Sequence, residues 1–201
     1  MHESTRSDRV VQGMSLIIAP LLFGVSTFLW RDGEYGAYGG TIVVVATVLW
    51  IAAFIGLFSL LKSKTPVYAS IGLMFAIAGC VSGAGFGFAD AYNEIFSISH
   101  QRYLKQLESY PTVAGLLLFW TGPLFPLTLL ILGIVLIKTK TLPIWVGLMI
   151  SISGVAFPLS RIPRIVWIAH CCDLIMFIPL CYIGCVYLSQ GDMKRPAMVT
   201  K

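Results

Sequence analysis

Six long runs of apolar residues alternate with short polar segments along the 201-residue chain. The apolar runs cover about 10–30, 41–61, 67–90, 112–137, 143–160 and 164–188. Each is close to the ~20 residues that an α-helix needs to cross the hydrocarbon core of a bilayer. Helices satisfy their own backbone hydrogen bonds, which lipid cannot do. The pattern therefore predicts an all-α, polytopic membrane protein, one bundle of six transmembrane helices over residues 1–201.

The composition agrees with this pattern. Hydrophobic residues make up 57% of the chain and charged residues 11%, with a mean hydropathy of +0.85. A soluble domain carries about 25% charged residues, so a water-soluble fold is excluded. The first run is long for a signal-peptide core and lacks a clear small-x-small cleavage site. We therefore expect it to stay as the first helix.

The net charge of +5 does not indicate nucleic-acid binding, because the basic residues form short clusters between the apolar runs. With both termini inside, the inner segments hold Arg6, Arg9, Lys62, Lys64, Lys138, Lys140, Lys194, Arg195 and Lys201. The outer segments hold Arg31, Arg102, Lys105, Arg161 and Arg164. Since cytoplasmic loops carry the excess of Lys and Arg, we predict an integral protein of the cytoplasmic or plasma membrane with both termini in the cytoplasm.

The third run carries small residues at helical spacing, namely Gly72, Ala76, Gly79, Gly83 and Gly87. Such a face allows two helix backbones to approach closely in lipid. We expect this face to point into the bundle. Asp90 lies three residues beyond its last glycine, so the Asp90 carboxylate is expected to point inward at the outer end.

Two prolines in the fourth run, Pro123 and Pro126, remove backbone donors and predict a kink. Residues 124–137, 140–147 and 157–162 resemble the C-terminal half of small bacterial multi-pass membrane proteins of the DUF4386-like type. That resemblance implies a helical membrane architecture and no particular activity.

The segment 91–111, between the third and fourth runs, alternates apolar and polar residues with a helical period. Its apolar positions are Tyr92, Phe96, Tyr103, Leu107 and Tyr110. This spacing predicts a short amphipathic helix on the outer membrane surface. The segment serves either as an interfacial anchor or as a lid over a pocket.

Asp173 is the one carboxylate well inside an apolar run, about 12 Å below the outer boundary at 1.5 Å per residue. A charge at that depth costs on the order of 2.5–3.5 kcal/mol, so Asp173 must be paired or protonated. His170 lies three residues earlier on the same helical face. We treat Asp173, His170 and Asp90 as the candidate acid and base groups.

Other polar and aromatic residues are expected at the same outer depth. The candidate binding residues are Trp30, Glu94, Trp120, Arg161 and Arg164. Together with the acidic groups they predict a polar, aromatic-lined pocket in the outer half of the bundle. The expected partners are membrane lipid and a lipophilic small molecule; association with a second copy of the chain is left open.

Several functions fit these residues. Asp173 could serve only to hold helix ends together through Arg161, Arg164 or His170. Alternatively, the pocket could bind a lipophilic molecule, and a buried acid with a second proton acceptor could isomerise or cyclise it without a cofactor. A transporter and a non-catalytic accessory or sensor subunit remain as further readings. We expect no metal site, because neighbouring residues on the sixth helix are about 100° apart and cannot share an ion.

Overall fold

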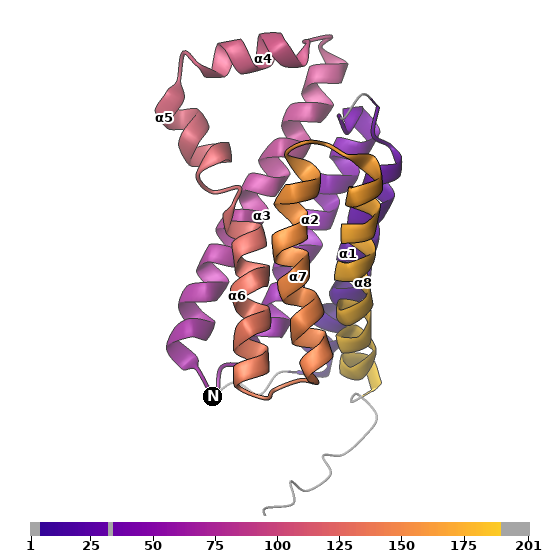
Figure 1. Ribbon diagram of the computed structural model, residues 1–201, viewed down its shortest axis with the longest axis vertical. Helices are drawn as coiled ribbons and strands as arrows, with labels where there is room; N and C mark the ends of the chain where they lie inside the picture. The colour runs from indigo at the N-terminus through magenta and orange to yellow at the C-terminus, as the bar shows by residue number, and fades with distance from the viewer. Residues whose placement is uncertain (1–4, 32–33, 190–201) are drawn as a thin grey trace, which may run out of the picture.

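The structure, a computed structural model, describes residues 5–31 and 34–189. Long helices dominate these residues (Figure 1). They are α1 (Arg6–Phe28), α2 (Gly36–Ser59), α3 (Pro66–Ile95), α6 (Leu124–Lys138), α7 (Ile144–Arg161) and α8 (Val166–Ser189). Between α3 and α6 lie α4 (His100–Leu107), α5 (Pro111–Ala114) and the π-helical η1 (Gly115–Phe119). Six segments are long and apolar enough to span a bilayer, with Pro111–Lys138 counted as one, which confirms the all-α polytopic bundle.

The long helices form a closed ring in the order α3, α2, α1, α8, α7, α6, with α6 returning to α3. The connections 60–65 and 139–143 meet at one end of this ring (Figure 1). We call that end the basic end, because it carries Lys62, Lys64, Lys138 and Lys140. The opposite end, which carries α4 and the α7–α8 connection, is called the far end.

The small-residue face of α3 lies inside the bundle, as expected. A Cβ atom on Gly79 would come within 2.5 Å of the backbone nitrogen of Phe125 in α6. A Cβ atom on Gly87 would come within 2.7 Å of the carbonyl oxygen of Gly40 in α2. Only glycine allows the backbone of α3 to approach both neighbours this closely.

The fourth transmembrane segment is broken where the two prolines predicted a kink. The Trp120 amide, directly after η1, donates to the Gly115 carbonyl at 2.7 Å, a five-residue closure that widens the helix. Pro123 is the residue that precedes the first turn of α6. The Ser82 hydroxyl of α3 donates to the Leu118 carbonyl at 3.1 Å, so a carbonyl near the break keeps a partner inside the bundle.

The amphipathic helix is shorter than the segment 91–111 suggested. Helix α3 continues to Ile95, and only α4 (His100–Leu107) forms a separate helix after a turn in which Ser97 has φ 54°. The Ser99 hydroxyl accepts a hydrogen bond from the Arg102 amide and so caps the start of α4. Burial and the nearby Asp90 carboxylate raise the pKa of Tyr103, so one side of α4 faces the far end of α3.

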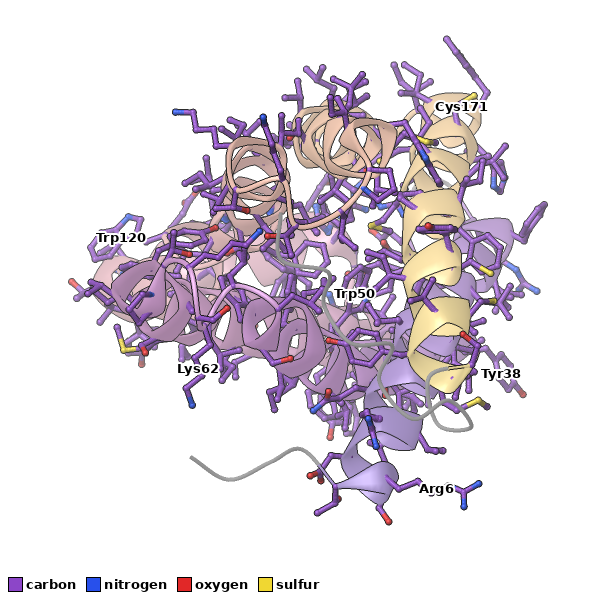
Figure 2. All side chains as sticks on the ribbon, turned by 90° about the horizontal axis from the view of Figure 1, so that it is seen from below. Arg6, Tyr38, Trp50, Lys62, Trp120 and Cys171 are labelled. Atoms are coloured by element: carbon purple, nitrogen blue, oxygen red, sulfur yellow. The ribbon has the colours of Figure 1, made fainter. Side chains whose placement is uncertain are left out.

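Aromatic rings fill the centre of the bundle. The Phe125 ring lies 5.7 Å from Phe23, 5.1 Å from Trp50 and 5.2 Å from Phe157. Viewed along the bundle axis, Trp50 lies inside the ring of helices (Figure 2). These rings, from four different helices, form an apolar layer below the polar groups of the far end.

Candidate functional site

Asp173 lies inside the far half of the bundle and is almost fully buried, with 4% of the residue exposed. Its Oδ1 accepts a hydrogen bond from Nη2 of Arg161 at 2.6 Å. Its Oδ2 accepts one from the Thr27 hydroxyl at 2.6 Å. Both oxygens therefore have strong, short partners, and the deep carboxylate is paired, as its position in the sequence required.

The α7–α8 turn brings the two charges together. Arg161 is the last residue of α7, and Asp173 lies two turns into α8. Pro163 cannot continue the helix, and Arg164 adopts φ 55°, so the chain reverses within a few residues. Thr27, in the last turn of α1, completes the contact. The ion pair thus joins three neighbouring helices at their far ends.

Two aromatic rings flank the Arg161 guanidinium. Its central carbon lies 5.0 Å from the Trp30 ring and 5.1 Å from the Phe157 ring. Phe157 precedes Arg161 by four residues, one helical turn, while Trp30 comes from the α1–α2 connection. The Tyr35 ring meets Trp30 edge-on at 5.3 Å. These distances fit cation–π contacts, which strengthen when the cation is desolvated.

Several N–H donors at this site lack acceptors. Nε and Nη1 of Arg161 are buried and have no hydrogen-bond partner among the described residues. Nε1 of Trp30 is also buried and makes no hydrogen bond of normal geometry with the described residues, although it lies beside the Tyr35 hydroxyl. Buried donors are normally satisfied, and leaving one unpaired costs on the order of 1–3 kcal/mol. The unpaired donors of these two stacked side chains therefore lie beside the ion pair in the far half of the bundle.

Asp90 and Glu94 lie one turn apart on α3 and both contact the start of α2. The Asp90 carboxylate accepts a hydrogen bond from the Tyr35 amide at 3.2 Å, and the Glu94 carboxylate accepts one from the Ala37 amide. Gly36, between these amides, has φ 62°. The two carboxylates thus satisfy donors at a helix N-terminus, where negative charge is favourable. Asp90 and Glu94 are therefore placed as caps for the N-terminus of α2.

The remaining predicted residues lie apart from the ion pair to different degrees. The His170 ring packs against Phe28, with 4.2 Å between ring centroids, at the contact of α8 with α1. Arg164 is half-buried in the α7–α8 turn. Trp120 is 62% exposed and points away from the bundle (Figure 2). The expectation that Trp120 lines an inward pocket is wrong, because the break at η1 turns its side chain outward.

The Tyr35 hydroxyl faces the same charges from the α1–α2 connection. Burial raises the pKa of this hydroxyl, and the positive charge of Arg161 opposes the shift. Tyr35 therefore stays a neutral phenol beside a neutral ion pair. Three further members of the cluster, Thr27, Tyr35 and Phe157, were not among the predicted site residues.

Within the described residues no three His, Cys, Asp or Glu side chains come together as they would around a metal ion. The cysteines of this part of the chain are free thiols. Beside the ion pair, the groups without a hydrogen-bond partner among the described residues are N–H donors on a cation and on an indole, with aromatic faces next to them.

Comparison of the chain with protein-family models, with curated proteins and with solved structures gives no match. The resemblance of residues 124–162 to DUF4386-like proteins stays a prediction.

Proposed function

We propose that this integral membrane protein binds a lipophilic small molecule in the far half of its bundle, with the polar head of that molecule beside Arg161 and Trp30. The supporting observation is the set of unpaired, buried N–H donors on these two stacked side chains. A ligand that brings acceptor oxygens to these donors removes their desolvation cost.

The electrostatics of the site favour a neutral head. Arg161 already has a counter-ion in Asp173 at 2.6 Å, so the pair has no net charge. A carboxylate or phosphate would place a second negative charge beside Asp173 in a poorly solvated site. A ketone, quinone, amide or ester oxygen accepts the same hydrogen bonds without that repulsion, and aromatic neighbours suit a flat apolar group attached to it.

The geometry favours binding over acid catalysis. Both oxygens of Asp173 accept short hydrogen bonds from Arg161 and Thr27, so neither oxygen is placed to deliver a proton to a bound molecule, as a general acid must. Asp90 is occupied at the start of α2. Isomerisation or cyclisation of the bound molecule would require the Arg161–Asp173 pair to open first.

Binding is also favoured over transport. Below the ion pair, the rings of Phe23, Trp50, Phe125 and Phe157 pack against one another. A polar solute would have to displace this layer to cross the bundle. We further propose that the basic end faces the cytoplasm, since its connections carry the lysine pairs that favour that side, and that the ligand site opens toward the outer leaflet.

Photo-labelling with an alkyl benzophenone tests the proposal. Its ketone oxygen is the acceptor, its alkyl tail suits lipid, and irradiation inserts the carbonyl carbon into neighbouring C–H bonds. Purified full-length protein in nanodiscs is irradiated, digested and mapped by mass spectrometry. We expect labelled peptides that contain Trp30 or Phe157, and competition by a long-chain alkyl ketone.

Arg161→Lys is the informative variant, because lysine keeps the positive charge beside Asp173 but loses the planar set of donors. We expect labelling at the site to fall at least about tenfold, because lysine cannot make one or two of the charge-assisted hydrogen bonds that arginine makes to the ligand. Arg164→Lys, in the same turn, is the matched control and retains labelling. Equal labelling in wild type and Arg161→Lys, or labelling spread evenly over lipid-facing peptides, would refute the proposal.

A further inference from the structure

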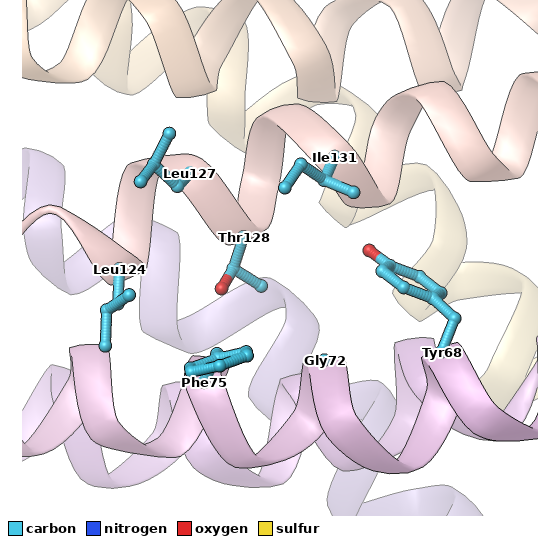
Figure 3. A pocket seen from close by; sticks show the side chains of 7 residues that line it. All are labelled: Tyr68, Gly72, Phe75, Leu124, Leu127, Thr128 and Ile131. Carbon is cyan, nitrogen blue, oxygen red and sulfur yellow. The ribbon is translucent and has the colours of Figure 1, made fainter.

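A second feature, remote from the far half, is an apolar groove between α3 and α6. Its volume is about 210 Å³, and it is lined by Tyr68, Gly72, Phe75, Leu124, Leu127, Thr128 and Ile131 (Figure 3). The helices touch at Gly79, where α3 approaches the Phe125 backbone. Toward the basic end they separate, and Tyr68 extends from α3 toward α6 across the opening (Figures 1 and 3).

Lysines stand at the basic end of this groove. Leu124, Ile131 and Lys138 follow at intervals of seven, so Lys138 continues the row of groove residues on α6. On the other side, Lys64 precedes Tyr68 by four residues, just before α3 begins. The Lys64 ammonium donates to the Thr139 carbonyl at 2.6 Å, which places it beside Lys138. Lys62 and Lys140, each two residues from one of these lysines in the sequence, are also exposed.

Such a groove cannot select an occupant by apolar contact alone. Lipid tails are as apolar as the side chains, so a tail gains little by moving from bulk lipid into the groove. The charges at its end decide which molecule stays. A phosphate at membrane-surface depth beside several lysines gains about 1 kcal/mol for each of them, and two Lys64 donors remain beyond the one used on Thr139.

We propose that this groove and the lysines at its end bind an anionic phospholipid of the leaflet that surrounds the basic end. One acyl chain lies between Phe75 and Ile131, and the phosphate contacts Lys64 and Lys138. The bound lipid fills the space that the divergence of α3 from α6 leaves open. This site is independent of the ligand position at Arg161, on the other half of the bundle.

Native mass spectrometry of the purified full-length protein in a neutral detergent tests this proposal, with phosphatidylglycerol and phosphatidylcholine of identical acyl chains as the probes. We expect phosphatidylglycerol to bind at least about tenfold more tightly. Lys64→Gln/Lys138→Gln lowers its affinity about fivefold for each lysine, or about 25-fold in all. Arg102→Gln/Lys105→Gln, two exposed cations of α4, is the matched control and leaves it unchanged.

Ile131→Trp fills the groove without removing a charge. Ile131 is 46% exposed, and Ile152 on the lipid-facing side of α7 is 43% exposed, so Ile152→Trp is the matched control. We expect only Ile131→Trp to reduce phosphatidylglycerol binding. Equal affinity for the two lipids, equal effects of the two tryptophans, or equal effects of the two double charge variants would overturn the proposal.

Discussion

The Arg161–Asp173 pair allows a quantitative prediction about stability. At 2.6 Å and an effective dielectric constant of about 20, the attraction between the charges is about 6 kcal/mol. The side chains are 11% and 6% exposed, so the desolvation of two ions, several kcal/mol each, offsets most of that gain. The net contribution of the pair to the free energy of unfolding is therefore small. Removing only one of the two charges is costly, because the other charge is then left buried without a partner.

The two substitutions that each remove one charge, Asp173→Val and Arg161→Met, should lower the free energy of unfolding by different amounts. Asp173→Val leaves a buried guanidinium that cannot give up its proton, and we expect it to lower the free energy of unfolding by about 3–5 kcal/mol. Arg161→Met leaves a carboxylate that can take up a proton and become neutral, so its cost should be lower, about 1–3 kcal/mol. The double variant removes both charges and should lie within about 1 kcal/mol of wild type.

Reversible unfolding in mixed micelles, followed by circular dichroism, measures the four proteins of this cycle. The coupling free energy between the two sites should be at least about 3 kcal/mol. Arg102→Met/Glu108→Val, which alters two exposed charges of α4, is the control and should show no coupling. A double variant as unstable as Asp173→Val, or an Asp173→Val protein as stable as wild type, would refute this account of the pair.

Four further substitutions test other parts of the bundle. Asp90→Asn and Glu94→Gln each remove a negative charge from the start of α2, and each should lower the free energy of unfolding by about 0.3–1 kcal/mol; unchanged thermal melting would contradict the capping role. Gly154→Leu places a side chain where the backbone of α6 lies 2.5 Å from the Cβ position. It should cost at least about 1–3 kcal/mol, while Val155→Leu on the exposed side costs little in the same melting experiment. Burial raises the pKa of Tyr35 above that of the unfolded chain, so its stabilising contribution is complete below about pH 10 and is lost as pH rises through the folded value. The decline in stability above pH 10 should be smaller in Tyr35→Phe, and equal declines would show that this phenol does not titrate with unfolding.

The apolar runs predicted the transmembrane helices well, because each run must satisfy its own backbone in lipid and has little choice but to be helical. The break in the fourth helix was also visible, since Pro123 cannot donate a backbone hydrogen bond. The π-helical form of the break was not predictable from the apolar pattern; in the structure, the Ser82 hydroxyl of α3 donates to a carbonyl of this segment. The end of α3 was predicted five residues early: Asp90 was expected to end the helix and Glu94 to lie in the amphipathic segment that follows, whereas both belong to α3 and contact the start of α2.

For the candidate site, the depth of Asp173 in the bundle was predictable from the sequence, and its hydrogen-bond partners were predictable only in part. Asp173 needed a partner, and Arg161 was among the partners considered, since both lie near the α7–α8 turn. Phe157 could have been found from its four-residue spacing to Arg161, and Thr27 from its three-residue spacing to Trp30. Tyr35 could not, because its place depends on how the α1–α2 connection folds back over the bundle. Trp120 was misplaced for the same kind of reason, a local break that rotates one side chain.

Stability alone does not account for the charges in the far half. An apolar pair of similar size at positions 161 and 173 is expected to be about as stable, since desolvation offsets the attraction. Nor does the pair satisfy itself, because Nε and Nη1 of Arg161 and Nε1 of Trp30 remain without acceptors among the described residues. A ligand with acceptor oxygens accounts for both features, since it uses the donors that Asp173 leaves free while Asp173 keeps the cation neutralised. It follows that the doubly substituted Arg161→Met/Asp173→Val protein should fold and still fail to be labelled by an alkyl ketone probe beside Trp30, which separates the contribution of these residues to binding from their contribution to the fold.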